Sequence, residues 1–230
     1  MSVNAVFIRI YRLLIVVNYL YFYIIRGLDM VAIIDYDAGN IKSVEKAILY
    51  LGEEFVMTRD EDVIMNADRV ILPGVGAYGD AMKKLEEYDL VRVIKEYVKT
   101  GKPFLGICLG LQLMFDSSEE TPGVKGLGLL PGTITKIPDD GEIKVPQIGW
   151  NSISVNPTSK LFKGIKDGSY VYFVHSYYLT CKNKEDVAAK TFYGTEIHAA
   201  VEHDNIFACQ FHPEKSGEVG LRIIKNFMEI

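Results

Sequence analysis

The sequence predicts an α/β fold in which a central, mostly parallel sheet is flanked by helices and the second half is β-rich and antiparallel. Two observations support this prediction. From residue 30 to about residue 115, short apolar segments alternate with amphipathic segments, which is the pattern of a parallel sheet covered on both faces. After about residue 122, glycines and prolines separate short extended segments, which is typical of antiparallel strands joined by turns.

Each element of the first half follows from its apolar periodicity. Continuous apolar runs predict strands, and runs that repeat every three to four residues predict helices. In the first helical segment, Ile41, Val44 and Ile48 fall on one face, while Gly101 is a stop signal for the last long helix. We expect strands at 31–36, 54–58, 68–72 and 104–107, and helices at 40–51, 77–87, 90–99 and 109–115.

The second half is expected to contain six short strands and one closing helix. The strands are expected at 133–137, 151–155, 170–174, 187–191, 198–202 and 206–211, and the helix at 218–228. No internal repeat separates the two halves, so residues 30–230 are expected to form a single domain.

Composition limits the possible functions. The chain has 230 residues, 49% of them hydrophobic, and a net charge of −5 with scattered Lys and Arg, so it lacks the basic patch of a nucleic-acid-binding protein. Three cysteines without CxxC spacing make a zinc site improbable. We expect no metal and no cofactor, and an odd cysteine count fits the reducing cytoplasm.

The first 29 residues are an apolar extension that we expect to lie outside the fold. Its longest stretch without a charged residue, 13–25, would span about 20 Å as a helix, less than the roughly 30 Å of a bilayer core. Met30 opens directly onto the first expected strand. Our first interpretation is an over-extended start with initiation at Met30, and the alternative is a tether to a membrane surface.

Cys108 is the first candidate for chemistry. It lies between an expected strand and an expected helix, with Gly106 and Gly110 on either side. A nucleophile on such a turn has a strained backbone, and glycines remove side chains that would collide there. The N-terminus of the following helix favours thiolate over thiol. The alternative is a buried structural cysteine between two packing glycines.

His212 and Glu214 are the candidate partners of this thiol, since a thiol nucleophile needs a base and the base needs an orienting group. They follow the expected strand 206–211 and are two residues apart. In extended backbone, which Pro213 would maintain, residues two apart share a face. The sequence therefore predicts a Cys108–His212–Glu214 triad, against the alternative of a solvated histidine at a strand end.

The segments GICLGLQ (106–112) and FHPEKS (211–216) resemble those of the triad-type, class I glutamine amidotransferases. That resemblance implies a flavodoxin-like sheet. Four further segments are similar to the glutaminase subunits of imidazole glycerol phosphate synthase in histidine biosynthesis: DYDAGN (35–40), PGVGAY (73–78), QIGWN (147–151) and FVHSYY (173–178). This implies hydrolysis of glutamine to glutamate and ammonia through a cysteine thioester.

The oxyanion of that reaction needs N–H donors. Leu109 begins the helix after the nucleophile, and the glycine-rich loop 73–76 is expected at the same carboxyl edge of the sheet. The resemblance implies that Val75 N–H is a donor and that activity depends on a partner enzyme, so we expect the partner to control the orientation of the Val75 peptide. It also implies that Gly74, Gly76, Gln112, Glu120, His175, Ser176 and Tyr177 address the substrate. From the sequence alone, His175 could equally be a hydrogen-bonded histidine at a strand end.

Residues 30–230 contain no motif for an acceptor of ammonia, so a partner subunit is implied. The resemblance names it as the (β/α)8-barrel cyclase that makes imidazole glycerol phosphate and aminoimidazole carboxamide ribotide. Asn40, Trp150 and Tyr172 are then expected at the interface, although Tyr172 could also be a core residue.

Three alternatives remain open at this point. The chain could be a glutaminase for another acceptor, in the synthesis of anthranilate, aminodeoxychorismate or pyridoxal phosphate. It could be a γ-glutamyl hydrolase or cysteine peptidase on a similar fold, although Gln112 after the nucleophile argues against this. It could also be a membrane-anchored binding module, which only residues 1–29 suggest.

Overall fold

The computed structural model describes residues 17, 29–39, 41–139, 141 and 143–230. The expected extension over 1–29 lies outside the described residues, apart from Val17 and Asp29, and so does Asn40. Among the described residues, no helix has the length and apolar character needed to cross a membrane.

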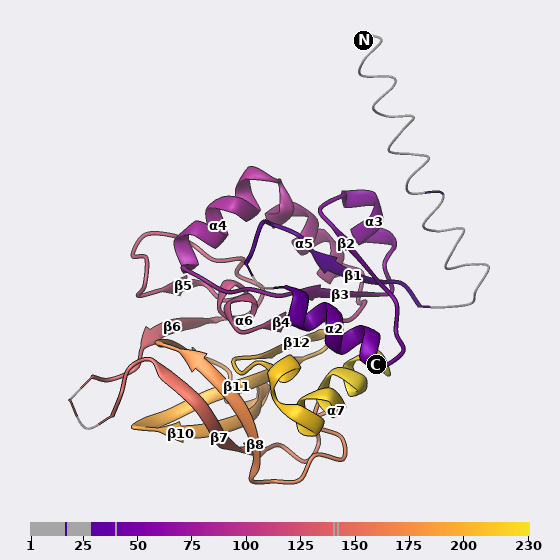
Figure 1. Cartoon of the computed structure of the whole chain (residues 1–230). Coiled ribbons are helices and arrows are strands. Elements are labelled where there is room, and N and C mark those ends of the chain that lie inside the picture. The colour runs from indigo at the N-terminus through magenta and orange to yellow at the C-terminus, as the bar shows by residue number, and fades with distance from the viewer. Residues whose placement is uncertain (1–16, 18–28, 40, 140, 142) are drawn as a thin grey trace.

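Helices and strands alternate through the first half, and strands dominate the second (Figure 1). The strands are β1 (Val31–Ile34), β2 (Phe55–Thr58), β3 (Arg69–Leu72), β4 (Phe104–Ile107), β5 (Ser117–Ser118), β6 (Gly132–Lys136), β7 (Gln147–Val155), β8 (Ser169–His175), β9 (Tyr177–Cys181), β10 (Val187–Tyr193), β11 (Thr195–His203) and β12 (Ile206–Cys209). The helices are α2 (Lys42–Tyr50), α3 (Glu61–Asn66), α4 (Tyr78–Glu87), α5 (Leu90–Lys99), α6 (Leu109–Leu113) and α7 (Gly217–Met228), with 3-10 turns at Lys184–Asp186 and Pro213–Lys215.

Nine strands form one mixed sheet in the order β2-β1-β3-β4-β12-β11-β10-β7-β8. The pairs from β2 to β12 are parallel, and those from β12 to β8 are antiparallel. A second sheet, β5-β6-β9, lies beside it. The predicted fold class is therefore confirmed.

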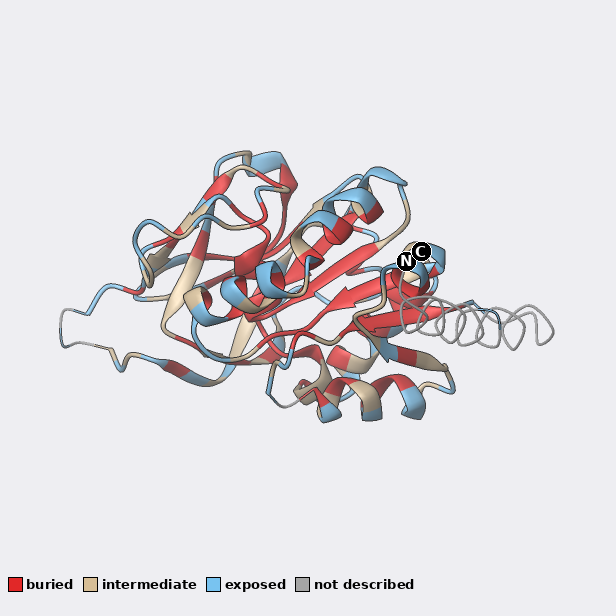
Figure 2. Cartoon of the chain, turned by 90° about the horizontal axis from the view of Figure 1, so that it is seen from above, coloured by how far each residue is buried: buried red, intermediate tan, exposed pale blue. Residues whose placement is uncertain are grey.

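Helices cover both faces of the parallel part (Figure 1). Alternate residues of β1 serve the two faces: Ala32 and Ile34 pack with helices α3, α4 and α5, whereas Val31 and Ile33 pack with α2 and α7. Because both faces of the sheet are covered, the strands whose sequences are continuously apolar are buried along their length. These strands are red in Figure 2.

Several elements differ from the expectations, and β7, for example, begins at Gln147 rather than at residue 151. Helix α3 and strand β5 were not anticipated, and the chain continues past His175 as β9. The expected strand 206–211 ends at Cys209, and Pro213 begins a 3-10 turn. The extended connection between His212 and Glu214 is therefore wrong: proline pre-sets the first residue of a tight turn as readily as an extended segment.

The carboxyl ends of β3, β4 and β12 lie side by side, because these strands are neighbours in the parallel sheet. The loop 73–76 follows β3, Cys108 follows β4, and His212 follows β12 within three residues. At Ser176 the chain leaves the large sheet and enters the small one, which brings residues 175–177 to the same edge. All candidate chemistry converges there, as expected for an open α/β sheet.

Candidate active site

Cys108 lies on a sharp turn between β4 and α6, with φ 55° and ψ −107°. A positive φ is strained for a residue with a side chain. The strained residue is held by a hydrogen bond from its backbone N–H to the Cys209 carbonyl, at 2.8 Å. The turn directs a side chain that is only 6% exposed toward a cavity.

The flanking glycines are required by close approach. A Cβ on Gly110 would lie 1.9 Å from the Leu72 carbonyl oxygen, and one on Gly106 would lie 2.9 Å from the Gly110 carbonyl. These contacts are with backbone atoms, which could move aside only if the strand or the helix shifted. The sequence-based reason for both glycines is therefore confirmed.

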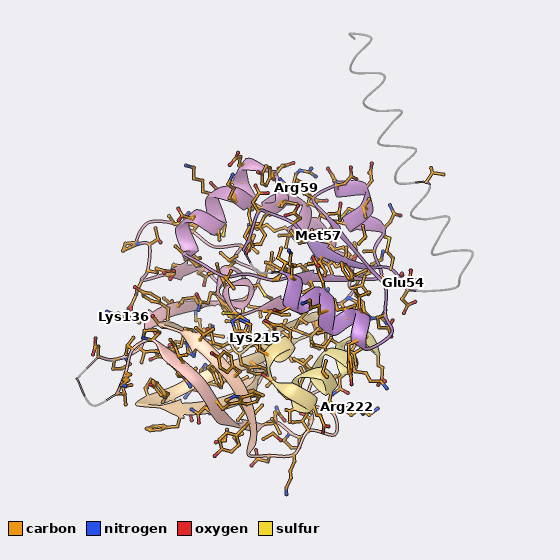
Figure 3. All side chains as sticks on the ribbon, in the orientation of Figure 1. Glu54, Met57, Arg59, Lys136, Lys215 and Arg222 are labelled. Carbon is orange, nitrogen blue, oxygen red and sulfur yellow. The ribbon has the colours of Figure 1, made fainter. Side chains whose placement is uncertain are left out.

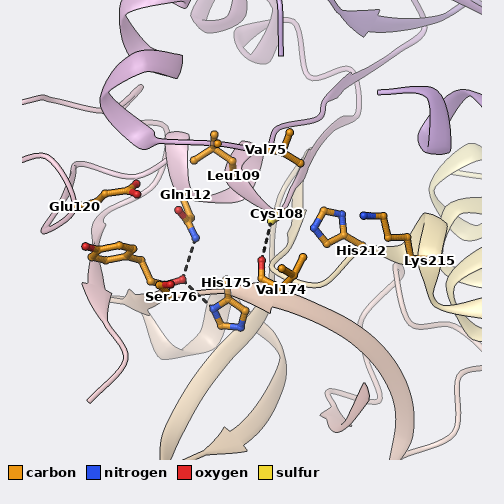
Figure 4. A pocket seen from close by; sticks show the side chains of 12 residues that line it. Val75, Cys108, Leu109, Gln112, Glu120, Val174, His175, Ser176, His212 and Lys215 are labelled. Carbon is orange, nitrogen blue, oxygen red and sulfur yellow. Dashed lines mark hydrogen bonds between the residues drawn. The ribbon is translucent and has the colours of Figure 1, made fainter. Parts of the chain in front are cut away.

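His212 faces Cys108 across the cavity, as Figure 4 shows. Its Nδ1 lies 2.7 Å from Glu214 Oε1, and both side chains are 3% exposed. A carboxylate only accepts hydrogen bonds, so Nδ1 carries a proton and Nε2 is left to exchange one with the sulfur. Ser216 fixes the backbone here, because its Oγ donates to the His212 carbonyl at 2.6 Å.

Burial alone lowers the pKa of His212, but its interactions with Cys108 and Glu214 raise that pKa to about 9. Glu214 acts through a short hydrogen bond. Nε2, which faces the sulfur, makes no hydrogen bond in this geometry, so Cys108 raises this pKa through its charge. The imidazole therefore retains its second proton at neutral pH when it faces a thiolate.

A cavity of about 280 Å³ lies in front of the sulfur. Its walls contain the predicted nucleophile and base and most of the predicted substrate residues (Figure 4). The predicted residues on its walls are Val75, Gly76, Cys108, Leu109, Gln112, Glu120, His175, Ser176, Tyr177 and His212. Glu214 lies behind His212, and Gly74 precedes Val75. The cavity also has two residues that sequence reasoning missed, Val174 and Lys215.

Gln112 and His175 both hold the Tyr177 carbonyl. Gln112 Nε2 donates to it at 3.0 Å, and His175 Nδ1 donates at 3.0 Å. Burial lowers the pKa of His175 to about 4, so this imidazole is neutral and serves as a fixed donor. Gln112 is 5% exposed, so it is a buried residue of the site and not a solvated residue on the surface of its helix.

The two candidate oxyanion donors do not point at a common atom. Leu109 N–H donates to the Gly74 carbonyl at 3.3 Å. In a trans peptide the C=O and the N–H point in opposite directions, so the Val75 N–H of that same peptide is directed away from Leu109. The Pro73 carbonyl, one residue earlier, accepts a hydrogen bond from Tyr36 Oη at 2.9 Å.

Glu120 reaches the cavity from the loop after β5. Its Oε2 accepts a hydrogen bond from Tyr78 N–H, at 2.8 Å, in the first turn of α4. The carboxylate is thus held in place by a helix N-terminus, where negative charge is favoured. Glu120 is distant from the nucleophile along the chain, so no local sequence pattern indicates that its side chain reaches the cavity.

The other two predicted interface residues are register partners on the β7–β8 hairpin. Trp150 is 54% exposed, and Tyr172, half-buried, meets it edge-on at 6.1 Å between ring centroids. Ile148 and Tyr170 are also exposed. These four share one face of the hairpin with Val174, which lines the cavity. We call this face, residues 148, 150, 170 and 172, the apolar strip.

Comparisons with known proteins agree on one family. The profile of "Glutamine amidotransferase class-I" matches residues 32–230. The chain is 51% identical over 201 residues to "Imidazole glycerol phosphate synthase subunit HisH" of Bacillus cereus (strain G9842), covering 87% of this chain and 95% of that protein. It is 48% identical to the HisH subunit of Caldanaerobacter subterraneus subsp. tengcongensis, covering 87% and 98%.

Solved structures with the same fold are more distant. A protein described as a glutamine amidotransferase superposes with a TM-score of 0.68 at 18% identity, covering 86% of this chain and 97% of its own. PurLQS from Thermotoga maritima superposes with a TM-score of 0.67 at 20% identity, covering 88% and 98%. At this identity the similarity concerns the fold.

Proposed function

This chain belongs to the class I glutamine amidotransferases and to the HisH subunits of imidazole glycerol phosphate synthase, and on that basis we propose a residue-level mechanism for its glutaminase reaction. The chain is a glutaminase subunit in histidine biosynthesis. The observation that carries the mechanism is the convergence of Cys108 and His212 on one cavity, with Glu214 2.7 Å behind the imidazole.

In the first step, the Cys108 sulfur attacks the side-chain carboxamide carbon of glutamine, and a tetrahedral oxyanion forms. His212 then donates its Nε2 proton to the departing nitrogen, which leaves as ammonia, and a thioester remains on Cys108. In the second step, His212 accepts a proton from water, which attacks the thioester and releases glutamate. Glu214 holds the ring and stabilises its charged form throughout.

The oxyanion is stabilised by Leu109 N–H and Val75 N–H after one peptide rotates. The Gly74 carbonyl now occupies the Leu109 N–H. Rotation of the Gly74–Val75 peptide by about half a turn removes that carbonyl and brings the Val75 N–H beside Leu109. Gly74 permits this rotation, because turning the peptide changes the ψ angle of a residue that has no side chain. We propose that the occupied partner subunit drives it.

Replacing Gly74 by alanine should lower glutaminase kcat in the complex by about 100-fold, the typical cost of losing one oxyanion donor. The new Cβ would lie 2.5 Å from Tyr36 Oη, 2.9 Å from Leu109 Cβ and 3.0 Å from Gly110 N. The loop would therefore be pushed away from the nucleophile turn. Steady-state release of glutamate measures the effect.

The matched control is Gly39→Ala, because among the described residues its Cβ would meet only Val75 Cγ2 within 4 Å, at an ordinary 3.5 Å. We expect this variant to stay within about twofold of the parent, since no contact is compressed. Equal activity of Gly74→Ala and the parent would remove the peptide rotation from the mechanism.

The head of glutamine lies between Gln112, Glu120 and the backbone of residues 175–177. Both N–H groups of the Gln112 amide are committed to protein acceptors, so its oxygen is the end available to accept from the substrate ammonium group. Glu120 adds a negative charge near that group. Lys215 and the backbone N–H groups of 175–177 supply donors for the substrate carboxylate.

Ammonia is useful to an acceptor only in its neutral form, so it needs a sheltered route out of the cavity. The apolar strip adjoins Val174, which lies beside Cys108, and it runs along the exposed face of β7 and β8. A partner that covered the strip would seal the cavity at this side. We propose that the (β/α)8-barrel cyclase docks here as a heterodimer, with both proteins in the cytoplasm.

Replacing Trp150 by alanine should weaken the complex by more than about 1 kcal/mol, or about fivefold in Kd, because exposed tryptophans at interfaces are frequent hot spots. Isothermal titration of the cyclase into each variant measures this. Tyr50→Ala is the control, since Tyr50 is an exposed aromatic, 78% accessible, at the end of α2. An unchanged Kd for Trp150→Ala would place the docking surface elsewhere.

Glutamine hydrolysis with and without the cyclase and its ribonucleotide substrate tests the function as a whole. We expect slow hydrolysis by the chain alone and a large increase in the complex with the ribonucleotide bound. Full activity without any partner would instead favour a free-standing γ-glutamyl hydrolase. Nitrogen transfer to chorismate or a pyridoxal phosphate precursor would favour another acceptor pathway.

A further inference from the structure

Gln210 lies one residue beyond β12, and no part of its side chain reaches solvent. Its backbone N–H donates to the Ala199 carbonyl at 2.8 Å, so the residue is fixed to the neighbouring strand. Its Nε2 lies 3.8 Å from the Cys108 sulfur, and its Oε1 lies 3.1 Å from Gln112 Nε2. The mechanism above gives this buried amide no role.

The orientation of the Gln210 side-chain amide is set by a relay of hydrogen bonds that begins at the Tyr177 carbonyl and passes through Gln112. The Tyr177 carbonyl can only accept hydrogen bonds, so the Gln112 nitrogen must face it, at 3.0 Å. The second hydrogen of that nitrogen then faces Gln210, which must present its oxygen. The Gln210 nitrogen is thereby turned toward the sulfur. A flipped amide at either glutamine would set two donors or two acceptors against each other.

We propose that Gln210 is a positioning residue for the nucleophile, whose N–H holds the sulfur of Cys108 and favours its thiolate form. This inference rests on the proposed glutaminase function and deepens it. It also links the nucleophile to the substrate-binding segment, because the relay begins at the Tyr177 carbonyl and passes through Gln112.

The surroundings of the sulfur explain why a neutral donor matters. The thiol has the Val174 carbonyl 4.0 Å away as an acceptor, and this contact becomes repulsive once the proton leaves. The Gln210 N–H, in contrast, becomes more attractive to a thiolate, because hydrogen bonds to an ionised group are the stronger ones. The amide adds no net charge, so it does not compete with His212 for Glu214.

Alkylation of Cys108 by iodoacetamide as a function of pH tests the proposal. The rate is measured on the full chain by mass spectrometry of the Cys108 peptide. In Gln210→Met, which keeps the length and loses the donor, we expect the midpoint of the profile to rise by about one pH unit. Glutaminase kcat in the complex should fall about tenfold.

The same titratable groups surround the sulfur in parent and variant, so the shift isolates the amide. They are Tyr36, Glu120, His175, Cys209, His212, Glu214 and Lys215.

Asn226→Met is the matched control for loss of a buried amide. Asn226 is 3% exposed and donates to the Leu161 and Lys163 carbonyls instead. We expect this variant to lose thermal stability without moving the alkylation midpoint. An equal shift in Asn226→Met would mean general loosening and would overturn the proposal.

Gln210→Glu provides a second variant if the methionine variant does not fold, because a carboxylate can still accept from Gln112. It lacks the donor and adds charge, so its midpoint should rise at least as far. A folded Gln210 variant whose profile coincides with that of the parent overturns the role of Gln210. Normal alkylation combined with absent glutamine turnover would instead contradict the proposed function, since alkylation needs no glutamine.

Discussion

Replacing Cys108 by serine should lower glutamine hydrolysis by the complex by about 10⁴-fold or more, because no other group in the cavity supplies a thioester. The strained turn would hold a serine hydroxyl in the same place, but a hydroxyl is a weaker nucleophile than a thiolate paired with His212. Binding of glutamine should survive, since the groups that address its head are unchanged. Glutamate release and equilibrium binding measured on the same preparation separate the two effects.

Cys181→Ser is the control for loss of a buried thiol. Cys181 is 3% exposed, and its sulfur faces the Asn183 carbonyl rather than the cavity. We expect this variant to keep its glutaminase activity within about twofold. Retained turnover in Cys108→Ser would refute the nucleophile assignment.

Replacing His212 by glutamine should lower kcat by about 10³-fold, within the range of general acid–base catalysis. Glutamine fills a similar volume and can hydrogen-bond Glu214, but it cannot deliver a proton to the departing nitrogen. Added imidazole should restore part of the activity. Rates near those of the parent would mean that another group carries the proton.

The same variant should change how stability depends on pH. The pKa of His212 is raised from 6.5 to about 9, so the folded state binds this proton more tightly than the unfolded state. The resulting stabilisation is complete below about pH 6.5 and is lost as pH rises through about 9. Urea midpoints between pH 6 and 10 should therefore fall more steeply for the parent than for His212→Gln. Parallel slopes would contradict the charged imidazole.

Most of the fold was accessible from the sequence because buried strands and amphipathic helices leave strong periodic signals. The β4 strand and the helices α4, α5 and α7 match their predicted limits to within a residue. The shortest elements were not predicted. Helix α3 has six residues with two buried side chains, Val63 and Ile64, and the two-residue strand β5 is defined only by its pairing with β6.

Residues of the candidate site could be predicted from the sequence where their role depends on their neighbours along the chain. Gly106 and Gly110 have a local steric reason, so a strand–turn–helix pattern was enough to identify the nucleophile turn. His212 and Glu214 were paired for a partly wrong reason, since a 3-10 turn and not extended backbone brings them together.

Relations between distant segments could not be inferred from the sequence. Gln210 matters because β12 lies next to β4, so its amide reaches Cys108 102 residues away. In the same way, the present contact between Leu109 N–H and the Gly74 carbonyl depends on how two loops meet. Neither apolar periodicity nor turn composition indicates a contact between segments that are distant in the sequence.

Direct detection of the covalent intermediate tests the central claim most closely. The complex is mixed with glutamine and the cyclase ribonucleotide, quenched in acid within milliseconds, digested and analysed by mass spectrometry. We expect a γ-glutamyl adduct on the peptide that contains Cys108. Rapid turnover with no adduct on that peptide, or an adduct on another residue, would contradict the account.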